Sequence, residues 1–319
     1  MLIMKILGVQ FKIDNNDFSE GYFKKHIEHF YKKTEPGDII IFPEDIGLVS
    51  AFIGIKSRDI PTAMQEIYVN KKEIVDKFVR NGNDFTKSLF LSLQDHFKSE
   101  FYNLFSDLSK KYAVYTFTCN NMGEGENIYN TCFVFDPRGN EIFRQRKVYL
   151  TNMEESLSID RGDLQDVRTL EINGIKFGIA ISLDAFYPDY LYLIRDMDIF
   201  IQPDANPGKW NSYIENGRWQ PEEWMDSTYF VAQRFPKVRY AINPMMVGNL
   251  LGIEFEGQSS IAKKAEPSDT HLGYIGNIPT TGFLEVMSIE KFNANEFHER
   301  KYIENISLDY PEGVLEVEI

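Results

Sequence analysis

The chain has 319 residues, of which 43% are hydrophobic and 26% are charged, and this length allows a sizeable core without disulfides or a metal. Its 48 acidic and 34 basic residues give a formal net charge of −14. Such a surface repels phosphate backbones and argues against nucleic-acid binding. The two cysteines, Cys119 and Cys132, are too few for a disulfide framework and fit a reducing compartment.

No segment of the sequence predicts export or membrane insertion. Residues 1–10 have an early lysine and no small-residue cleavage site, so we interpret them as a buried strand and not as a signal peptide. No apolar run approaches the ~20 residues that a membrane helix needs. We therefore expect a cytoplasmic protein without a membrane partner.

The first third of the chain predicts strands alternating with helices. Residues 2–11 form a mostly apolar run typical of a buried strand, and apolar residues at helical spacing over 23–30 predict the helix that follows. Residues 38–42 predict a short strand with both faces buried. Between 54 and 110 the spacing of apolar residues predicts two or three helices.

Strands dominate from residue 111 onward. A turn sequence at 136–140 and the pair Asn173–Gly174 predict two hairpins, and helices are expected over 188–196 and 221–234. Apolar and β-branched runs predict strands at 113–118, 131–135, 141–149, 167–172, 175–182, 198–201, 239–242, 257–263 and 283–289.

The order of these elements predicts an α/β fold. Alternating elements with hairpins indicate two stacked sheets inside and helices outside. The sequence has no evident linker, repeat or low-complexity stretch, so we expect one domain over 1–319. It would carry a helical insertion at about 54–95 and a C-terminal tail from about 301.

Three polar residues stand at or near the ends of predicted apolar strands, where α/β folds place ligands. Glu44 follows the strand at 38–42. Lys147 lies inside a strand pattern, where a lysine either extends to solvent or stays charged beside a carboxylate. Ser182 ends the strand at 175–182 and enters a turn, a position that can expose a nucleophile.

Each of these residues has an ordinary structural interpretation when it is taken alone. Glu44 could belong to a solvated acidic loop, Lys147 to a basic strand edge, and Ser182 to a local turn hydrogen bond. Their combination, in this order along the chain, favours a shared chemical site.

The three segments together resemble the nitrilase superfamily of carbon–nitrogen hydrolases. The similarity lies in a strand followed by Pro43–Glu44, then in Arg-Lys-Val at 146–148, and then in Gly-Ile-Ala-Ile-Ser-Leu-Asp-Ala-Phe-Tyr-Pro-Asp at 178–189. The resemblance implies a four-layer α-β-β-α sandwich that hydrolyses nitriles, amides or carbamoyl groups with a Glu–Lys–Cys set. We expect no cofactor, and the five histidines show no zinc-binding spacing.

The resemblance also implies a role for each site residue. Glu44 matches the general base, and Lys147 matches the lysine that stabilises the tetrahedral intermediate. Glu155, eight residues after the lysine, matches the supporting second glutamate, with Glu154 as the close alternative. Ser182 takes the place of the nucleophilic cysteine.

Substrate contacts are expected near the serine and after the strand at 198–201. The backbone N–H of Leu183 is expected to face the developing negative charge, and the aromatic residues Phe186 and Tyr187 to influence specificity. Asn206 resembles a pocket-lining residue, whereas Trp210 could line a substrate cleft or simply pack. The expected partner is a small amide, nitrile or carbamoyl compound, and the resemblance implies a homodimer or larger homo-oligomer.

The serine at position 182 departs from the family pattern and bears on turnover. A thiol has a pKa of about 8.5, whereas a serine hydroxyl is a far weaker acid, and glutamate is a poor base for it. Either an active hydrolase has had its cysteine replaced deliberately, or the serine is natural in a non-catalytic relative that binds a ligand or partner. A third possibility is a true serine amidase. In the first two cases we expect weak activity or none.

Overall fold

The chain folds into two β-sheets in the computed structural model, which describes residues 4–276, 278–300 and 308–319. The described part of the first sheet has nine strands, with β16 beside β1, β9 beside β11, and the remaining order β12–β11–β1–β2–β3–β4–β5. Their bounds are β1 (Lys5–Ile13), β2 (Ile39–Ile41), β3 (Tyr115–Glu124), β4 (Asn127–Phe135), β5 (Glu141–Arg146), β9 (Asp204–Ala205), β11 (Met245–Leu250), β12 (Ile253–Phe255) and β16 (Gly313–Glu318).

The second sheet has seven strands among the described residues, in the order β14–β15–β13–β10–β8–β7–β6. Their bounds are β6 (Leu170–Ile172), β7 (Ile175–Ile179), β8 (Ile199–Ile201), β10 (Tyr240–Asn243), β13 (Ser260–Lys263), β14 (His271–Ile275) and β15 (Ile278–Val286). Strands β7, β8 and β10 run parallel, so their C-terminal ends lie at one edge of this sheet.

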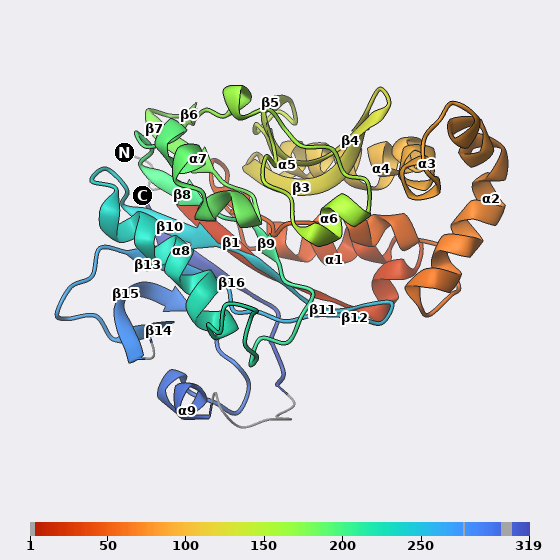
Figure 1. The fold of residues 1–319 in the computed structure, drawn as a ribbon. Coiled ribbons are helices and arrows are strands. Elements are labelled where there is room, and N and C mark those ends of the chain that lie inside the picture. Colours follow the sequence, from red (N-terminus) through yellow and green to blue (C-terminus); the bar gives the residue numbers. More distant parts are fainter. Residues whose placement is uncertain (1–3, 277, 301–307) are drawn as a thin grey trace.

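Helices pack on the outer faces of both sheets. Among them, α5 packs on β3 and β4, and α8 packs on β10, β13 and β14. The helices of the described residues are α1 (Tyr22–Tyr31), α2 (Ile60–Arg80), α3 (Phe85–Ser92), α4 (Gln94–Phe97), α5 (Leu104–Tyr112), α6 (Asn152–Ser156), α7 (Pro188–Leu193), α8 (Gln220–Arg234) and α9 (Ala294–Glu299). Figure 1 shows α2 and α3 at one end of the molecule, far from β14 and β15. The predicted arrangement of two inner sheets and outer helices is confirmed.

The inner faces of the two sheets share an aliphatic core. In β2, Ile39 and Ile41 point into this core, while Ile40 points to the helices on the other side, as the two-residue period of a strand requires. Each fully buried isoleucine contributes about 1.5–3 kcal/mol relative to exposure. The sheets approach closely at Gly8, where an added Cβ would lie 3.1 Å from Ile242 Cγ2.

Several local predictions are confirmed. Asn173 and Gly174 both have positive φ, 52° and 81°, which is the turn geometry that matches the twist of a hairpin. The division of residues 54–110 into separate helices is also present: α2 ends at Arg80, and Asp84 caps α3 by accepting from the Lys87 N–H at 2.9 Å.

The helical region holds more segments than expected. Helices α4 and α5 are joined by a π-helical stretch at Lys98–Asn103, and α2 leaves helical geometry at Lys71. The helical period is therefore broken within α2. Ile67 and Val75 are buried, but Ile74 is 45% exposed.

The C-terminal tail was not predicted to join a sheet. Residues 301–307 of the predicted tail lie outside the described residues, but β16 pairs antiparallel with β1, with Leu7 opposite Glu316. In the described part of the chain, no helix combines the length and the hydropathy that crossing a membrane would require.

Candidate active site

The three residues singled out in the sequence lie just beyond the ends of three strands. Glu44 follows β2, Lys147 follows β5 directly, and Ser182 follows β7. All three line one cavity of about 370 Å³. The sheets therefore bring together side chains that are far apart in the sequence.

Lys147 lies between two carboxylates. Its Nζ is 2.8 Å from Glu44 Oε1 and 2.8 Å from Glu154 Oε2, and its side chain is 1% exposed. Asn130 of β4 connects the same two acids, donating through Nδ2 to Glu44 Oε1 at 2.8 Å and to Glu154 Oε1 at 3.0 Å. The Ala205 N–H donates to Glu44 Oε2 at 3.2 Å. Such pairing is what makes buried charges tolerable.

Burial and mutual attraction shift the pKa values of these groups in different directions. Burial raises the pKa of Glu44, and the nearby Lys147 offsets only part of that rise. Burial alone would lower the pKa of Lys147, but Glu44 and Glu154 outweigh it and hold the pKa above its ordinary value. Burial favours a higher pKa for Glu154 too, yet Lys147 keeps that pKa below its usual range. Lys147 thus stays charged, and Glu44 is the more proton-avid of the two acids.

Ser182 has a strained backbone at a turn. Its φ is 48°, which costs a non-glycine residue about 1–3 kcal/mol and occurs often at functional positions. The Ser182 N–H donates to the Pro203 carbonyl at 3.1 Å, and the residue is 2% exposed. The turn places the Ser182 hydroxyl at the cavity wall.

Asp184 joins the serine turn to the lysine loop. Its Oδ1 accepts from the Val148 N–H at 3.0 Å and from the Tyr149 N–H at 2.8 Å. Burial raises the pKa of Asp184 to about 8, although the two N–H donors and Lys147 act against this rise. Asp184 and Asn130 were not predicted from the sequence to have a role. An acid placed in an otherwise apolar turn was the available signal for Asp184.

The prediction that Glu155 supports the lysine is geometrically wrong, and Glu154 occupies that place. Thr151 caps α6 by accepting from the Glu154 N–H, while Glu154 Oε2 accepts from the Thr151 N–H at 2.9 Å. This capping box turns residue 154 inward. Glu155 comes next on the helix, points elsewhere, and pairs with Arg161 on the surface with its side chain 47% exposed.

The expected substrate contacts divide into two groups. Asn206 lines the cavity. Trp210 does not, because it is fully buried and its indole N–H donates to Gln258 Oε1 at 2.9 Å; Trp224 lines the cavity in its place. The packing interpretation of Trp210 is therefore the right one.

Three residues near the serine are also absent from the cavity wall. Phe186 packs edge-on against Trp224 with ring centroids 5.5 Å apart. Tyr187 stacks on Tyr149 at 3.6 Å and is 37% exposed. Leu183 is half-buried, and the proposed role of its backbone N–H remains a prediction.

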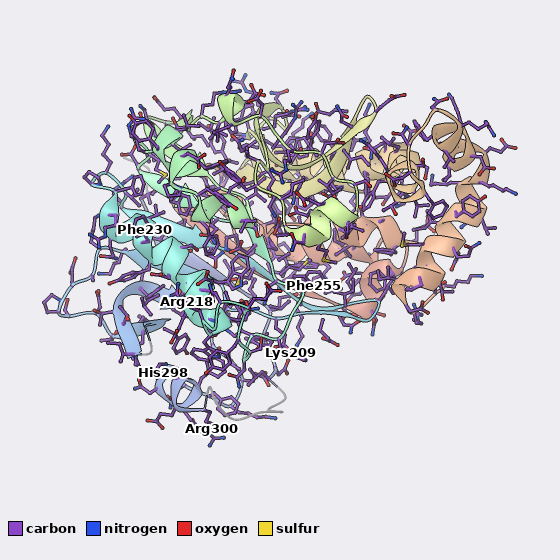
Figure 2. All side chains as sticks on the ribbon, in the orientation of Figure 1. Lys209, Arg218, Phe230, Phe255, His298 and Arg300 are labelled. Atoms are coloured by element: carbon purple, nitrogen blue, oxygen red, sulfur yellow. The ribbon has the colours of Figure 1, made fainter. Side chains whose placement is uncertain are left out.

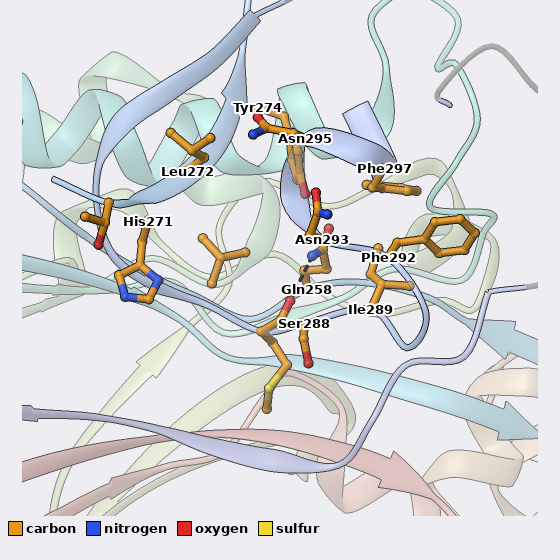
Figure 3. Close-up of a pocket in the computed structure, with 13 residues that line it drawn as sticks. Gln258, His271, Leu272, Tyr274, Ser288, Ile289, Phe292, Asn293, Asn295 and Phe297 are labelled. Carbon is orange, nitrogen blue, oxygen red and sulfur yellow. Dashed lines mark hydrogen bonds between the residues drawn. The ribbon is translucent and has the colours of Figure 1, made fainter. Parts of the chain in front are cut away.

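A second hollow of about 390 Å³ lies by β14 and α9 (Figure 3). His271, Tyr274 and Asn293 are among the side chains around it, but its described lining includes no carboxylate, lysine or arginine. The acid–base set therefore belongs to the first cavity. No group of three or more potential metal ligands is present among the described residues.

The chain belongs to the carbon–nitrogen hydrolase family, whose model matches residues 25–264. A curated relative, nitrilase homolog 2 of Dictyostelium discoideum, is 29% identical over 120 residues, which cover 34% of this chain. That match spans about a third of the relative's own length, 35%.

Solved structures share the same architecture. A Saccharomyces cerevisiae member of branch 10 of the nitrilase superfamily has a TM-score of 0.57 at 16% identity, covering 99% of this chain and 89% of that one. A Helicobacter pylori carbon–nitrogen hydrolase has a TM-score of 0.58 at 17% identity, with 89% and 87% covered. A variant of the amidase from Nesterenkonia sp. in complex with butyramide has a TM-score of 0.56 at 14% identity, with 100% and 94% covered. The α/β nitrilase-type sandwich is thus confirmed.

Proposed function

We propose that this site is built to hydrolyse a carbon–nitrogen bond other than a peptide bond, in an amide, nitrile or carbamoyl compound. Glu44 is the general base, Lys147 stabilises the negative charge of the tetrahedral intermediate, and Glu154 holds Lys147 in place. Residue 182 is the position of the nucleophile. The observation that carries this proposal is Lys147 Nζ at 2.8 Å from both Glu44 and Glu154, in a cavity that Ser182 also lines.

For an amide substrate, the proposed reaction begins with a thiol at position 182. Glu44 takes the thiol proton while sulfur bonds to the carbonyl carbon, and the oxygen becomes an anion that Lys147 and the Leu183 N–H stabilise. The C–N bond then breaks, and the amine leaves with the proton returned by Glu44. Glu44 next removes a proton from water, whose oxygen attacks the thioester and releases the carboxylic acid and the thiol.

The electrostatics of the site agree with these roles. A general base works best when its pKa approaches the working pH, and burial raises the pKa of Glu44. Lys147 keeps its proton because two carboxylates contact it, so it serves as a fixed positive charge. Because the cavity wall is largely apolar, that charge acts more strongly on the intermediate than it would in water.

With serine at position 182, binding should persist but turnover should be poor. The hydroxyl proton is much less acidic than a thiol proton, and a glutamate removes it badly. The Nesterenkonia amidase offers a comparison: acrylamide adds to an active-site cysteine in one of its structures, and a cysteine-to-serine variant has also been solved. The serine is also the observation that favours the alternative, a non-catalytic relative that binds a ligand or partner.

Restoring the thiol tests the proposal. Ser182→Cys is assayed for ammonia release from panels of amides, nitriles and carbamoyl compounds. Ser288→Cys is the control, because it adds a thiol beside the second hollow, whose described lining has no carboxylate or ammonium. We expect release from Ser182→Cys alone. No release from any panel would favour the binding protein, and equal release from the unaltered chain would favour a serine amidase.

A further inference from the structure

The wall of the catalytic cavity is mostly apolar, and much of it comes from the helical region between 54 and 95. Ile60, Met64 and Ile67 of α2, together with Leu89 and Phe90 of α3, line the cavity beside the catalytic set. On another side, Phe255 ends β12 and lines it as well. Figure 2 shows Phe255 well away from His298 and Arg300, which lie at the α9 end of the molecule.

The cavity has no spare positive charge to receive an acidic group. Among the described residues that line it, Lys147 is the one cation, and two carboxylates already contact its Nζ. A carboxylate on the substrate would therefore lose its hydration without gaining a partner, which is costly. A cationic group would meet the same apolar wall, and Glu44 and Glu154 are already engaged by Lys147 and Asn130. The third carboxyl group of the wall, Asp45, accepts from Asn121 Nδ2 at 3.0 Å, and burial together with the neighbouring acids raises its pKa well above the ordinary value.

The size of the cavity is also informative. Its volume of about 370 Å³ lies within the range of small-molecule pockets. A short amide such as acetamide would leave most of this apolar space unfilled. An extended acyl chain would fill that space and contact the apolar side chains of the wall.

We propose that the site selects amides or nitriles whose acyl part is extended, uncharged and apolar, and that α2 and α3 supply this selectivity. That the bound amide or nitrile is a substrate depends on the proposed function. The binding preference itself follows from the residues of the cavity wall. Each added CH₂ buried against the wall should tighten binding roughly fourfold, until the cavity is full. Amides of the same chain length that end in a charged group should not show this gain in affinity.

Equilibrium binding to the unaltered Ser182 protein tests the preference without requiring turnover. Butyramide, hexanamide and octanamide form the length series, and adipic acid monoamide and ε-aminocaproamide are the charged analogues of hexanamide. Calorimetric titration should show at least tenfold tighter binding of octanamide than of butyramide, and at least tenfold weaker binding of both charged amides than of hexanamide. Affinities that stay flat with length, or that favour either charged amide, would overturn the proposal.

A pair of lysine substitutions on α2 tests the role of the helix. Met64→Lys places a cation at the cavity wall, whereas Val69→Lys is the matched control because Val69 is 63% exposed and does not line the cavity. Met64→Lys should weaken hexanamide binding at least tenfold and shift the preference toward adipic acid monoamide. Val69→Lys should change neither. Equal effects of both variants on binding would contradict the proposed role of α2 in selectivity.

Failure of this inference and failure of the proposed function give different results. If Ser182→Cys releases ammonia but affinity does not change with chain length, the proposed hydrolase function is supported and the proposed apolar selectivity is contradicted. If affinity rises with chain length but Ser182→Cys releases no ammonia from the same amides, the apolar binding site is supported and the hydrolase function is contradicted.

Discussion

The Asp184 carboxylate accepts a 2.8 Å hydrogen bond from the Tyr149 N–H, and this contact joins the turn that carries Ser182 to the loop that follows Lys147. The same oxygen accepts from the Val148 N–H. Two of the proposed site residues therefore share one buried support. Changes at Asp184 should affect stability and the geometry of the site together.

Replacing Asp184 separates its acceptor role from its charge. Asp184→Ala leaves two backbone N–H groups without this partner, and we expect a loss of about 2–4 kcal/mol in the free energy of unfolding. Asp184→Asn keeps an oxygen acceptor and should lose less than about half of that. Urea unfolding followed by circular dichroism measures both variants. Equal losses would show that the acceptor is not what matters.

The raised pKa of Asp184 predicts a pH dependence of stability. Burial raises this pKa from 3.8 to about 8, so the folded state binds the proton more tightly than the unfolded chain does. The resulting contribution is present in full below about pH 4 and is lost as pH rises through about 8. The unaltered protein should therefore lose stability relative to Asp184→Asn between pH 5 and pH 8. A difference that does not change over this range would refute the assignment.

Removing the lysine should destabilise the fold strongly. Lys147→Met leaves Glu44 and Glu154 buried without their cation, and we expect a loss of about 3–5 kcal/mol at neutral pH. Lys5→Met is the control, because the Lys5–Glu316 pair is exposed, 40% and 45%, and such pairs contribute about 0–1 kcal/mol. Thermal and urea unfolding of both variants give the comparison. A loss below about 1 kcal/mol for Lys147→Met would contradict the buried ion-pair geometry.

The neighbours Glu154 and Glu155 provide a matched test of the supporting acid. In the Ser182→Cys background, Glu154→Gln removes one of the two charges that hold Lys147, and we expect ammonia release to fall at least tenfold. Glu155→Gln alters only a surface pair with Arg161 and should change the rate less than twofold. The reverse order of effects would restore Glu155 to the site.

The sequence was informative where the signal was local. The apolar run at 39–42 followed by a carboxylate, the spacing over 23–30 and the pair Asn173–Gly174 each predict an observed element, because strand, helix and turn preferences act over a few residues. The ends of strands also predicted where Glu44 and Ser182 lie. Long-range pairing was not readable, and the partnership of β16 with β1 joins residues about three hundred positions apart.

The sequence also did not show which of two neighbouring residues faces the site, or which aromatic residue packs in the core and which lines the cavity. The motif spacing could not separate Glu154 from Glu155, since the capping box at Thr151 decides which of them turns inward. Trp210 and Trp224 are both aromatic residues after the same strand, yet only Trp224 lines the cavity among the described residues. The buried Trp210 donates its indole N–H to the distant Gln258, and no local pattern encodes that contact.

The central claim is that Glu44 and residue 182 act together on one carbon–nitrogen bond. Ammonia release by Ser182→Cys, compared with the double variant Ser182→Cys/Glu44→Gln on the same amide, tests it most directly. We predict at least a hundredfold higher rate for Ser182→Cys than for the unaltered chain, and loss of that gain when Glu44→Gln is added. Equal rates for the single and the double variant would contradict the account.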